Sequence, residues 1–181
     1  WKRVRDLVHK HHKSLSSFSY EQGLCYTDPL IFAASKGRLD VVEDLIDNAD
    51  RGDICIDING AERERGHTAL HRATLNGHLD IVELLIRSGA DTTILTEQGS
   101  SLLHLASWKG HFGFVKTLLQ NGAAVDQKNN NGDSALMLSA KCGHVEIIKF
   151  LIRNGADVNA VQKANMTGDK VGEELRKYFT V

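Results

Sequence analysis

The sequence predicts an all-α solenoid, a stack of short helix pairs in which each pair buries the apolar face of its neighbour. Three observations predict this fold class. Glycines recur every 33 residues, apolar residues follow helical spacing between them, and the 181-residue chain has one proline beside 16 glycines. A chain with so little proline is expected to end its helices with glycine, and helix pairs this short must stack to form a core.

The repeat is visible in three glycine columns that share one period. The interval of 33 residues (99 − 66 and 132 − 99) separates the members of each column, which are Gly66, Gly99 and Gly132, then Gly77, Gly110 and Gly143, then Gly89, Gly122 and Gly155. A histidine follows each glycine of the second column, at His78, His111 and His144. A fixed period of this length is the signature of a repeat architecture.

Each copy predicts two helices and a turn. In the second copy we expect helices over residues 69–76 and 79–88, because the apolar stripe that includes Ile81, Val82 and Leu85 follows helical spacing. Gly77 and Gly89 end these helices in the left-handed conformation that glycine adopts at little steric cost. The turn-prone residues after the second helix predict a β-hairpin finger that points toward the next copy.

The residues within each copy resemble a known family. The segment Thr68-Ala-Leu-His-Arg-Ala73 is similar to the T-P-L-H-x-A signature of ankyrin repeats, which also have a 33-residue period. A degenerate first copy begins near Thr27 and keeps the proline, Pro29. The resemblance implies an ankyrin-repeat solenoid of four copies, at residues 24–62 with a seven-residue insertion, 63–95, 96–128 and 129–161.

The remaining segments are expected to be caps and a loop. Residues 1–23 predict a basic N-terminal capping helix, at about 2–13, followed by a serine-rich linker, and residues 162–181 predict a C-terminal capping helix. The insertion in the first copy, at about residues 48–55, is interpreted as a loop at the base of a finger. Two interpretations of the insertion remain: a loop extension that the fold tolerates, or a loop that contacts a partner.

Composition excludes several function classes. Lys and Arg total 22 against 23 for Asp and Glu, so bulk charge is not the basis of function. The apolar runs are too short for a membrane span or a signal peptide, and we expect a soluble, monomeric module. Three scattered cysteines favour reduced thiols in the cytosol or nucleus. Trp1 in place of an initiator methionine indicates a fragment of a longer chain.

No catalytic or metal site is expected. Five of the nine histidines occupy repeat positions, His71 and His104 in the signature and the three at the starts of second helices. The family resemblance implies that such side chains hydrogen-bond across turns and between copies. Residues one repeat apart are on the order of 10 Å apart, too far to share a metal at about 2.1 Å. We therefore expect a non-enzymatic protein without cofactor or metal.

The resemblance implies a partner-binding surface on the concave face, formed by fingers and first helices. Carried over by position, the candidate residues are Leu75, Asn76, Trp108, Lys109 and Lys141 at the helix ends, and Arg65, His67, Glu97, Gln98 and Asp133 on the fingers. Trp108 is interpreted as an interface anchor, and packing against a neighbouring finger is the alternative. The two lysines favour an acidic or extended peptide.

These residues predict a protein-interaction module, a scaffold, adaptor or targeting domain of a signalling protein. It is expected to bind a protein or peptide and no small-molecule substrate. The alternative is binding of nucleic acid or anionic phospholipid through residues 1–24, whose five basic and two acidic side chains give a net charge of +3. A separate hypothesis is hydroxylation of Asn159. Leu151 and the Asp-Val-Asn-Ala segment around Asn159 resemble the pattern that an ankyrin-directed asparaginyl hydroxylase accepts, while a turn-capping role is the alternative.

Overall fold

A computed structural model describes residues 29–52, 56–159 and 161. The two predicted capping helices, the serine-rich linker and the last part of the insertion, residues 53–55, lie outside the described residues. The chain divides into two compact units, Trp1–Thr92 and Thr93–Val181, and each is described by itself. No helix in the described part of the chain combines the length and apolar character needed to cross a membrane.

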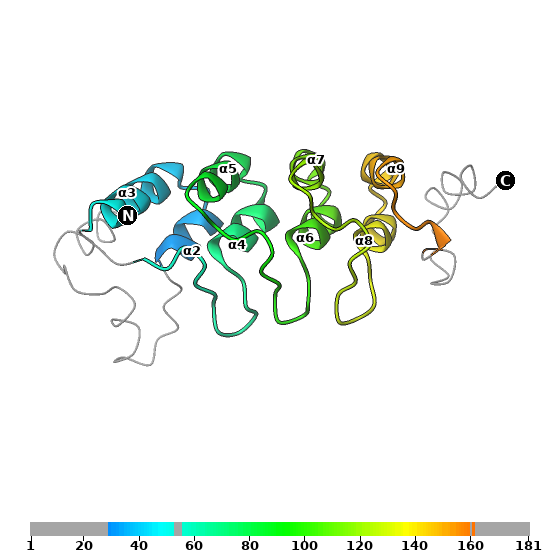
Figure 1. Ribbon diagram of the computed structural model, residues 1–181, viewed down its shortest axis with the longest axis horizontal. Coiled ribbons are helices and arrows are strands. Elements are labelled where there is room, and N and C mark those ends of the chain that lie inside the picture. The colour runs from blue at the N-terminus through cyan, green and yellow to red at the C-terminus, as the bar shows by residue number, and fades with distance from the viewer. Residues whose placement is uncertain (1–28, 53–55, 160, 162–181) are drawn as a thin grey trace. The chain divides into compact units, whose positions relative to one another are not determined.

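In the part of the chain that the structure describes, each unit contains two helix pairs. The first unit has α2 (Pro29–Ser35), α3 (Leu39–Asp50), α4 (Ala69–Asn76) and α5 (Leu79–Arg87), and the second has α6 (Leu102–Lys109), α7 (Phe112–Gln120), α8 (Ala135–Cys142) and α9 (Val145–Arg153). First helices pack on first helices, α2 on α4 and α6 on α8, and second helices pack on second helices, α3 on α5 and α7 on α9 (Figure 1). The predicted all-α repeat architecture is confirmed.

The core of each unit lies between its two helix layers. In the second unit, fully buried aliphatic side chains come from all four helices, including Leu103, Val115, Leu136 and Ile148. Burial of each such side chain contributes on the order of 1.5–3 kcal/mol. Helices of eight or nine residues are too short to be stable alone, so this packing between neighbouring repeats holds them in place.

The first helices of the last three copies begin with the same cap. Ser101 is the N-cap of α6, its hydroxyl accepts the backbone N–H of His104, and the His104 side chain accepts the backbone N–H of Ser101. Thr68 and His71 do the same in α4. In α8 the sulfur of Met137 replaces the imidazole. These reciprocal bonds satisfy donors that a helix start otherwise leaves unpaired.

His104 and His144 connect neighbouring copies, as the resemblance implies for histidines at these positions. Because His104 Nδ1 accepts a backbone bond, its Nε2 carries the proton and donates to the carbonyl of Asp133, 3.0 Å away on the next finger. His144 Nε2 likewise donates to the carbonyl of Trp108, at 3.1 Å. Each bond joins residues about one repeat apart, so these side chains set the spacing of the stack.

The fingers are closed by single pairings. Isolated antiparallel bridges join Ala61 to Thr68 and Lys128 to Ser134. The finger between them in sequence is closed by a hydrogen bond from the Thr96 N–H to the Ser100 carbonyl, at 3.0 Å. The predicted hairpin fingers are therefore present, and no regular β-strand forms in them among the described residues.

The insertion in the first copy begins as helix, which corrects the prediction of a loop from residue 48. Helix α3 has 12 residues, whereas α5, α7 and α9 have nine each. At the position where the later copies carry Gly89, Gly122 and Gly155, the first copy has Ala49. Alanine favours helix continuation, and α3 ends only at Asp50, shortly before Gly52 with its φ of 80°.

Candidate functional site

The ends of α6 and α8 form the clearest candidate surface in the second unit. Trp108, the next-to-last residue of α6, is 47% exposed, and the ammonium of Lys109 lies 4.3 Å from the centre of its ring. The bond from His144 to the Trp108 carbonyl brings the end of α6 beside the turn that follows α8. An exposed Trp with polar neighbours is typical of an interface anchor, so this placement favours the anchor interpretation.

Lys141 and Asp133, both expected to face a partner, pair with each other. The Lys141 Nζ lies 2.7 and 2.8 Å from the two carboxylate oxygens of Asp133. Asp133 is buried, because its backbone lies in the base of the finger where its carbonyl accepts the His104 bond. Asp133 therefore supports the finger, and only Lys141 of this pair is exposed.

Leu75 and Asn76 occupy the matching positions in the first unit. Leu75 is half-buried, and Asn76 is exposed at the last residue of α4. The Asn76 amide donates to the backbone carbonyl of Ser35 at 3.0 Å, so it ties the ends of α2 and α4 together. An amide held in this way presents a fixed polar edge beside Leu75.

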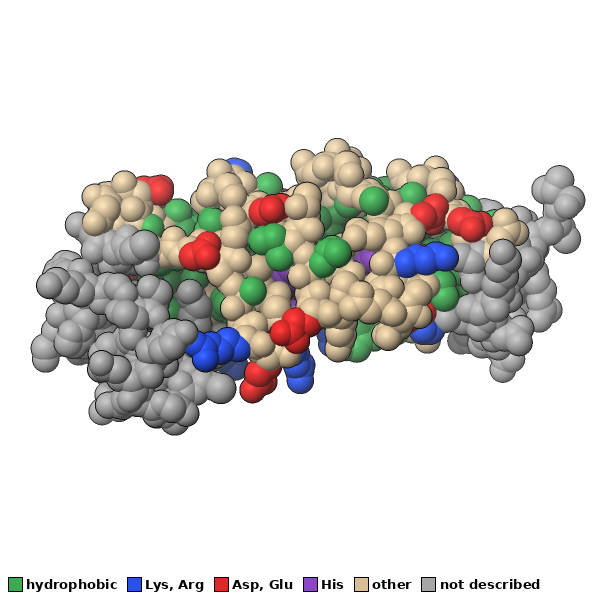
Figure 2. Space-filling view, turned by 60° about the horizontal axis from the view of Figure 1, so that its bottom comes forward, with side chains coloured by type: hydrophobic (Ala, Val, Ile, Leu, Met, Phe, Trp, Pro, Cys, Tyr) green, Lys and Arg blue, Asp and Glu red, His purple; other side chains and the backbone are tan. Residues whose placement is uncertain are grey.

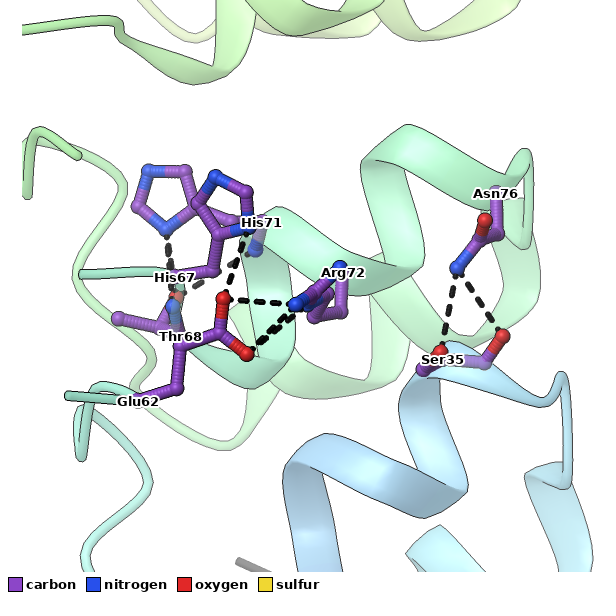
Figure 3. A network of polar contacts seen from close by, with 7 residues as sticks. All are labelled: Ser35, Glu62, His67, Thr68, His71, Arg72 and Asn76. Atoms are coloured by element: carbon purple, nitrogen blue, oxygen red, sulfur yellow. Dashed lines mark hydrogen bonds and ion pairs between the residues drawn. The ribbon is translucent and has the colours of Figure 1, made fainter. Parts of the chain in front are cut away.

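His67, also predicted on the partner surface, is instead buried in a polar cluster at the base of its finger (Figure 3). Glu62 lies between His67 and Arg72. Its carboxylate accepts three bonds from the Arg72 guanidinium, at 2.6, 2.7 and 3.2 Å. It also lies 3.2 Å from His67 Nδ1. Desolvation by burial, with repulsion from Arg72, lowers the pKa of His67 despite the nearby Glu62. The cluster holds the finger on α4.

The other finger residues remain accessible. Arg65, Glu97 and Gln98 are all exposed. The Glu97 carbonyl accepts a bond from the Asn130 side-chain amide, and the Gln98 carbonyl accepts one from the Asn130 backbone N–H, each at 3.0 Å. Asn130 therefore joins the two fingers of the second unit. The side chains of Glu97 and Gln98 stay available for a partner.

Charge on the surface is local. On the face drawn in Figure 2, acidic and basic side chains are interspersed among uncharged and hydrophobic ones. Within the described ranges, no group of three or more His, Cys, Asp or Glu side chains is arranged to hold a metal ion.

Asn159 is exposed at a turn after α9. Its backbone N–H and its side-chain amide both donate to the Asp157 carboxylate, at 2.9 and 3.1 Å. Leu151, eight residues earlier, is buried. The amide thus takes part in the turn, the role that the alternative interpretation assigns to it, while it remains accessible to solvent.

Two ion pairs were not anticipated from the sequence. Glu62–Arg72 and Asp133–Lys141 each join a finger to the first helix that follows it. Their spacings of ten and eight residues match the distance in sequence from the base of a finger to the exposed side of that helix. Opposite charges eight to ten residues apart, one on a finger and one on the next first helix, could therefore have predicted these ion pairs.

The described geometry defines a class of protein, a repeat protein built from stacked helix pairs with projecting fingers. A family model for ankyrin repeats, in three copies, matches residues 4–96 and 88–162. The chain belongs to the ankyrin-repeat family.

Curated proteins that it resembles differ widely in function. Alpha-latroinsectotoxin-Lt1a from Latrodectus tredecimguttatus is 43% identical over 63 residues, 35% of this chain and 4% of the toxin. Ankyrin repeat domain-containing protein 49 from Bos taurus is 39% identical over 67 residues, 37% of this chain and 26% of the relative. Palmitoyltransferase akr1 from Schizosaccharomyces pombe is 41% identical over 66 residues, 36% of this chain and 9% of the enzyme. The chain therefore matches a small part of each relative.

Proposed function

We propose that this chain is a non-catalytic interaction module that binds a protein partner, through an extended segment, on the surface formed by its first helices and fingers. Ankyrin repeats generally mediate protein–protein interaction and are typically non-catalytic. The fold is shared by many functions, so the argument for a particular surface depends on the residues that the stack does not require.

The observation that carries the proposal is the exposure of Trp108. The apolar side chains that recur in the helices and form the core are buried, whereas Trp108 is 47% exposed. A Trp is among the costliest side chains to leave in water. The equivalent position in the next copy is the exposed Lys141, so the repeat fold does not dictate an aromatic residue here. Large, rigid side chains of this kind supply much of the binding energy at interfaces.

The test is affinity capture with wild-type chain and the variant Trp108→Ala. Phe112→Ala is the matched control, because Phe112 is a 41% exposed aromatic residue on α7, in the layer of second helices. We expect Trp108→Ala to unfold as cooperatively as wild type and to lose about 2 kcal/mol or more of partner binding. Normal capture by Trp108→Ala, or loss of folding, would contradict the assignment.

The proposal extends to the setting of the module. We propose that it acts as a scaffold, adaptor or targeting segment in cytosolic or nuclear signalling, because Cys142 is an exposed free thiol that an oxidising compartment would leave open to pairing. Imaging of the tagged full-length protein tests the compartment. Enrichment in the secretory pathway would contradict it.

A further inference from the structure

The second unit places an exposed aromatic ring and an unpaired cation side by side. The ammonium of Lys109 lies 4.3 Å from the ring centre of Trp108, and no carboxylate of a described residue lies within ion-pair distance of it. A cation–π contact at an exposed site is a weak attraction. This is enough to bias the flexible lysine toward the ring, so the apolar and cationic groups form one composite site.

Lys141 cannot supply the same charge. Its ammonium is within 2.8 Å of both oxygens of Asp133, and Asp133 is only 8% exposed. A ligand carboxylate that drew Lys141 away would leave a buried carboxylate without its cation, which is unfavourable. The positive charge available to a ligand at the ends of α6 and α8 is therefore that of Lys109.

Resting on the proposed function, we propose that this site recognises an extended acidic peptide with an apolar side chain at one position and Asp or Glu two residues away. The apolar side chain covers the Trp108 ring and the carboxylate pairs with Lys109. In an extended chain, side chains two residues apart lie on the same face, about 6.6 Å from each other. That separation suits a ligand that contacts the ring at van der Waals distance and an ammonium 4.3 Å from its centre.

The neighbouring charges give the peptide a direction. Glu97 is exposed on the finger that precedes α6, whereas Lys109 is the last residue of α6. An eight-residue helix is about 12 Å long, so the two charges lie at opposite ends of the site. The ligand carboxylate is attracted to the helix end and repelled from the finger.

The probe is an array of short synthetic peptides on a Gly/Ser background, each with one fixed Leu. Glu is placed one, two or three residues after that Leu, or Gln replaces Glu at the second position, and the array is also made with the order reversed. Binding of labelled full-length chain is measured at low and high salt. We expect Glu two residues from Leu to bind about twofold to fivefold more tightly than Gln, and the difference to shrink with salt.

Variants assign that preference to residues. Lys109→Gln is expected to bind the Glu and Gln peptides equally, and Lys109→Arg to keep the preference. Lys116→Gln is the matched control, since it removes an equal charge from an exposed position on α7. If Lys109→Gln keeps the preference, or if Lys141→Gln removes it instead, the assigned cation is wrong.

The outcomes separate this inference from the proposed function. Trp108-dependent binding without a preference for Glu two residues from Leu overturns the inference and leaves the interaction surface in place. No binding of any peptide by wild type also overturns the inference alone, whereas partner capture that is indifferent to Trp108→Ala overturns both.

Discussion

Replacing Gly110 with alanine tests how tightly neighbouring repeats are joined. Gly110 ends α6 with a φ of +81°, and a Cβ added there would lie 2.6 Å from His144 Cε1 and 2.8 Å from its Nδ1. The left-handed conformation costs a non-glycine residue about 1–2 kcal/mol. Displacing the imidazole also breaks its bond to the Trp108 carbonyl, worth about 1 kcal/mol. We expect Gly110→Ala to lower the free energy of unfolding by about 2–3 kcal/mol.

Gly122→Ala is the matched control. Gly122 has a φ of +84°, but a Cβ added there would meet nothing within 4 Å. The Gly122→Ala variant should therefore lose only the free energy that the left-handed backbone conformation costs alanine, about 1–2 kcal/mol. Urea unfolding of the full chain, compared at equal m-values, measures both variants.

The difference between the two variants isolates the contact with His144. In a His144→Ala background, Gly110→Ala should cost no more than Gly122→Ala, because the imidazole that the new methyl meets is gone. Equal destabilisation by the two glycine variants in the wild-type background would refute the reasoning.

Three further predictions follow from buried polar groups and from Asn159. Burial lowers the pKa of His67 and of His104, so the unfolded chain takes up protons that the folded chain does not. Stability should be fully present above about pH 6.5 and decline as the pH falls below it, and urea midpoints across this range should show a weaker decline for His104→Gln. Ser107→Ala should raise the free energy of unfolding by about 1 kcal/mol, because the buried hydroxyl has no partner among the described residues. The same position is alanine in the first and fourth copies, so the stack accommodates the smaller side chain. Destabilisation in the same assay would show that the hydroxyl is bonded. Incubation with an ankyrin-directed asparaginyl hydroxylase should add one oxygen to the peptide containing Asn159. The peptide containing Asn59 should gain none, because Arg51 stands in place of leucine eight residues before Asn59. An unshifted Asn159 peptide in the mass spectrum would contradict this hypothesis.

Helix positions in this chain were predictable because they depend on local chemistry. Helix α4 covers the predicted residues 69–76, and α5 ends at Arg87, one residue before the predicted end. The caps and terminal glycines that define these helices lie within a few residues of the backbone groups they satisfy. The extension of α3 follows the same logic, since Ala49 replaces the glycine that ends the equivalent helices.

The candidate surface was only partly predictable. Trp108, Lys109 and Glu97 are exposed as expected, because their positions on the repeat set which side faces solvent. His67 and Asp133 occupy equally variable positions and are buried. Asp133 pairs with Lys141 on the following helix, and His67 lies beside Glu62, which pairs with Arg72 on the helix that follows its finger.

The sequence by itself determined the repeat and, in the second copy, the helix boundaries to within one residue, because both depend on residue type and spacing along the chain. Only the tertiary structure decided which charges of the predicted surface are available. Lys141 and Lys109 are both lysines at helix ends, yet one is neutralised by a buried carboxylate and the other lies on an exposed ring. Exposure and charge pairing depend on what the fold brings within a few ångströms of a side chain, and that is set by the packing of fingers and helices.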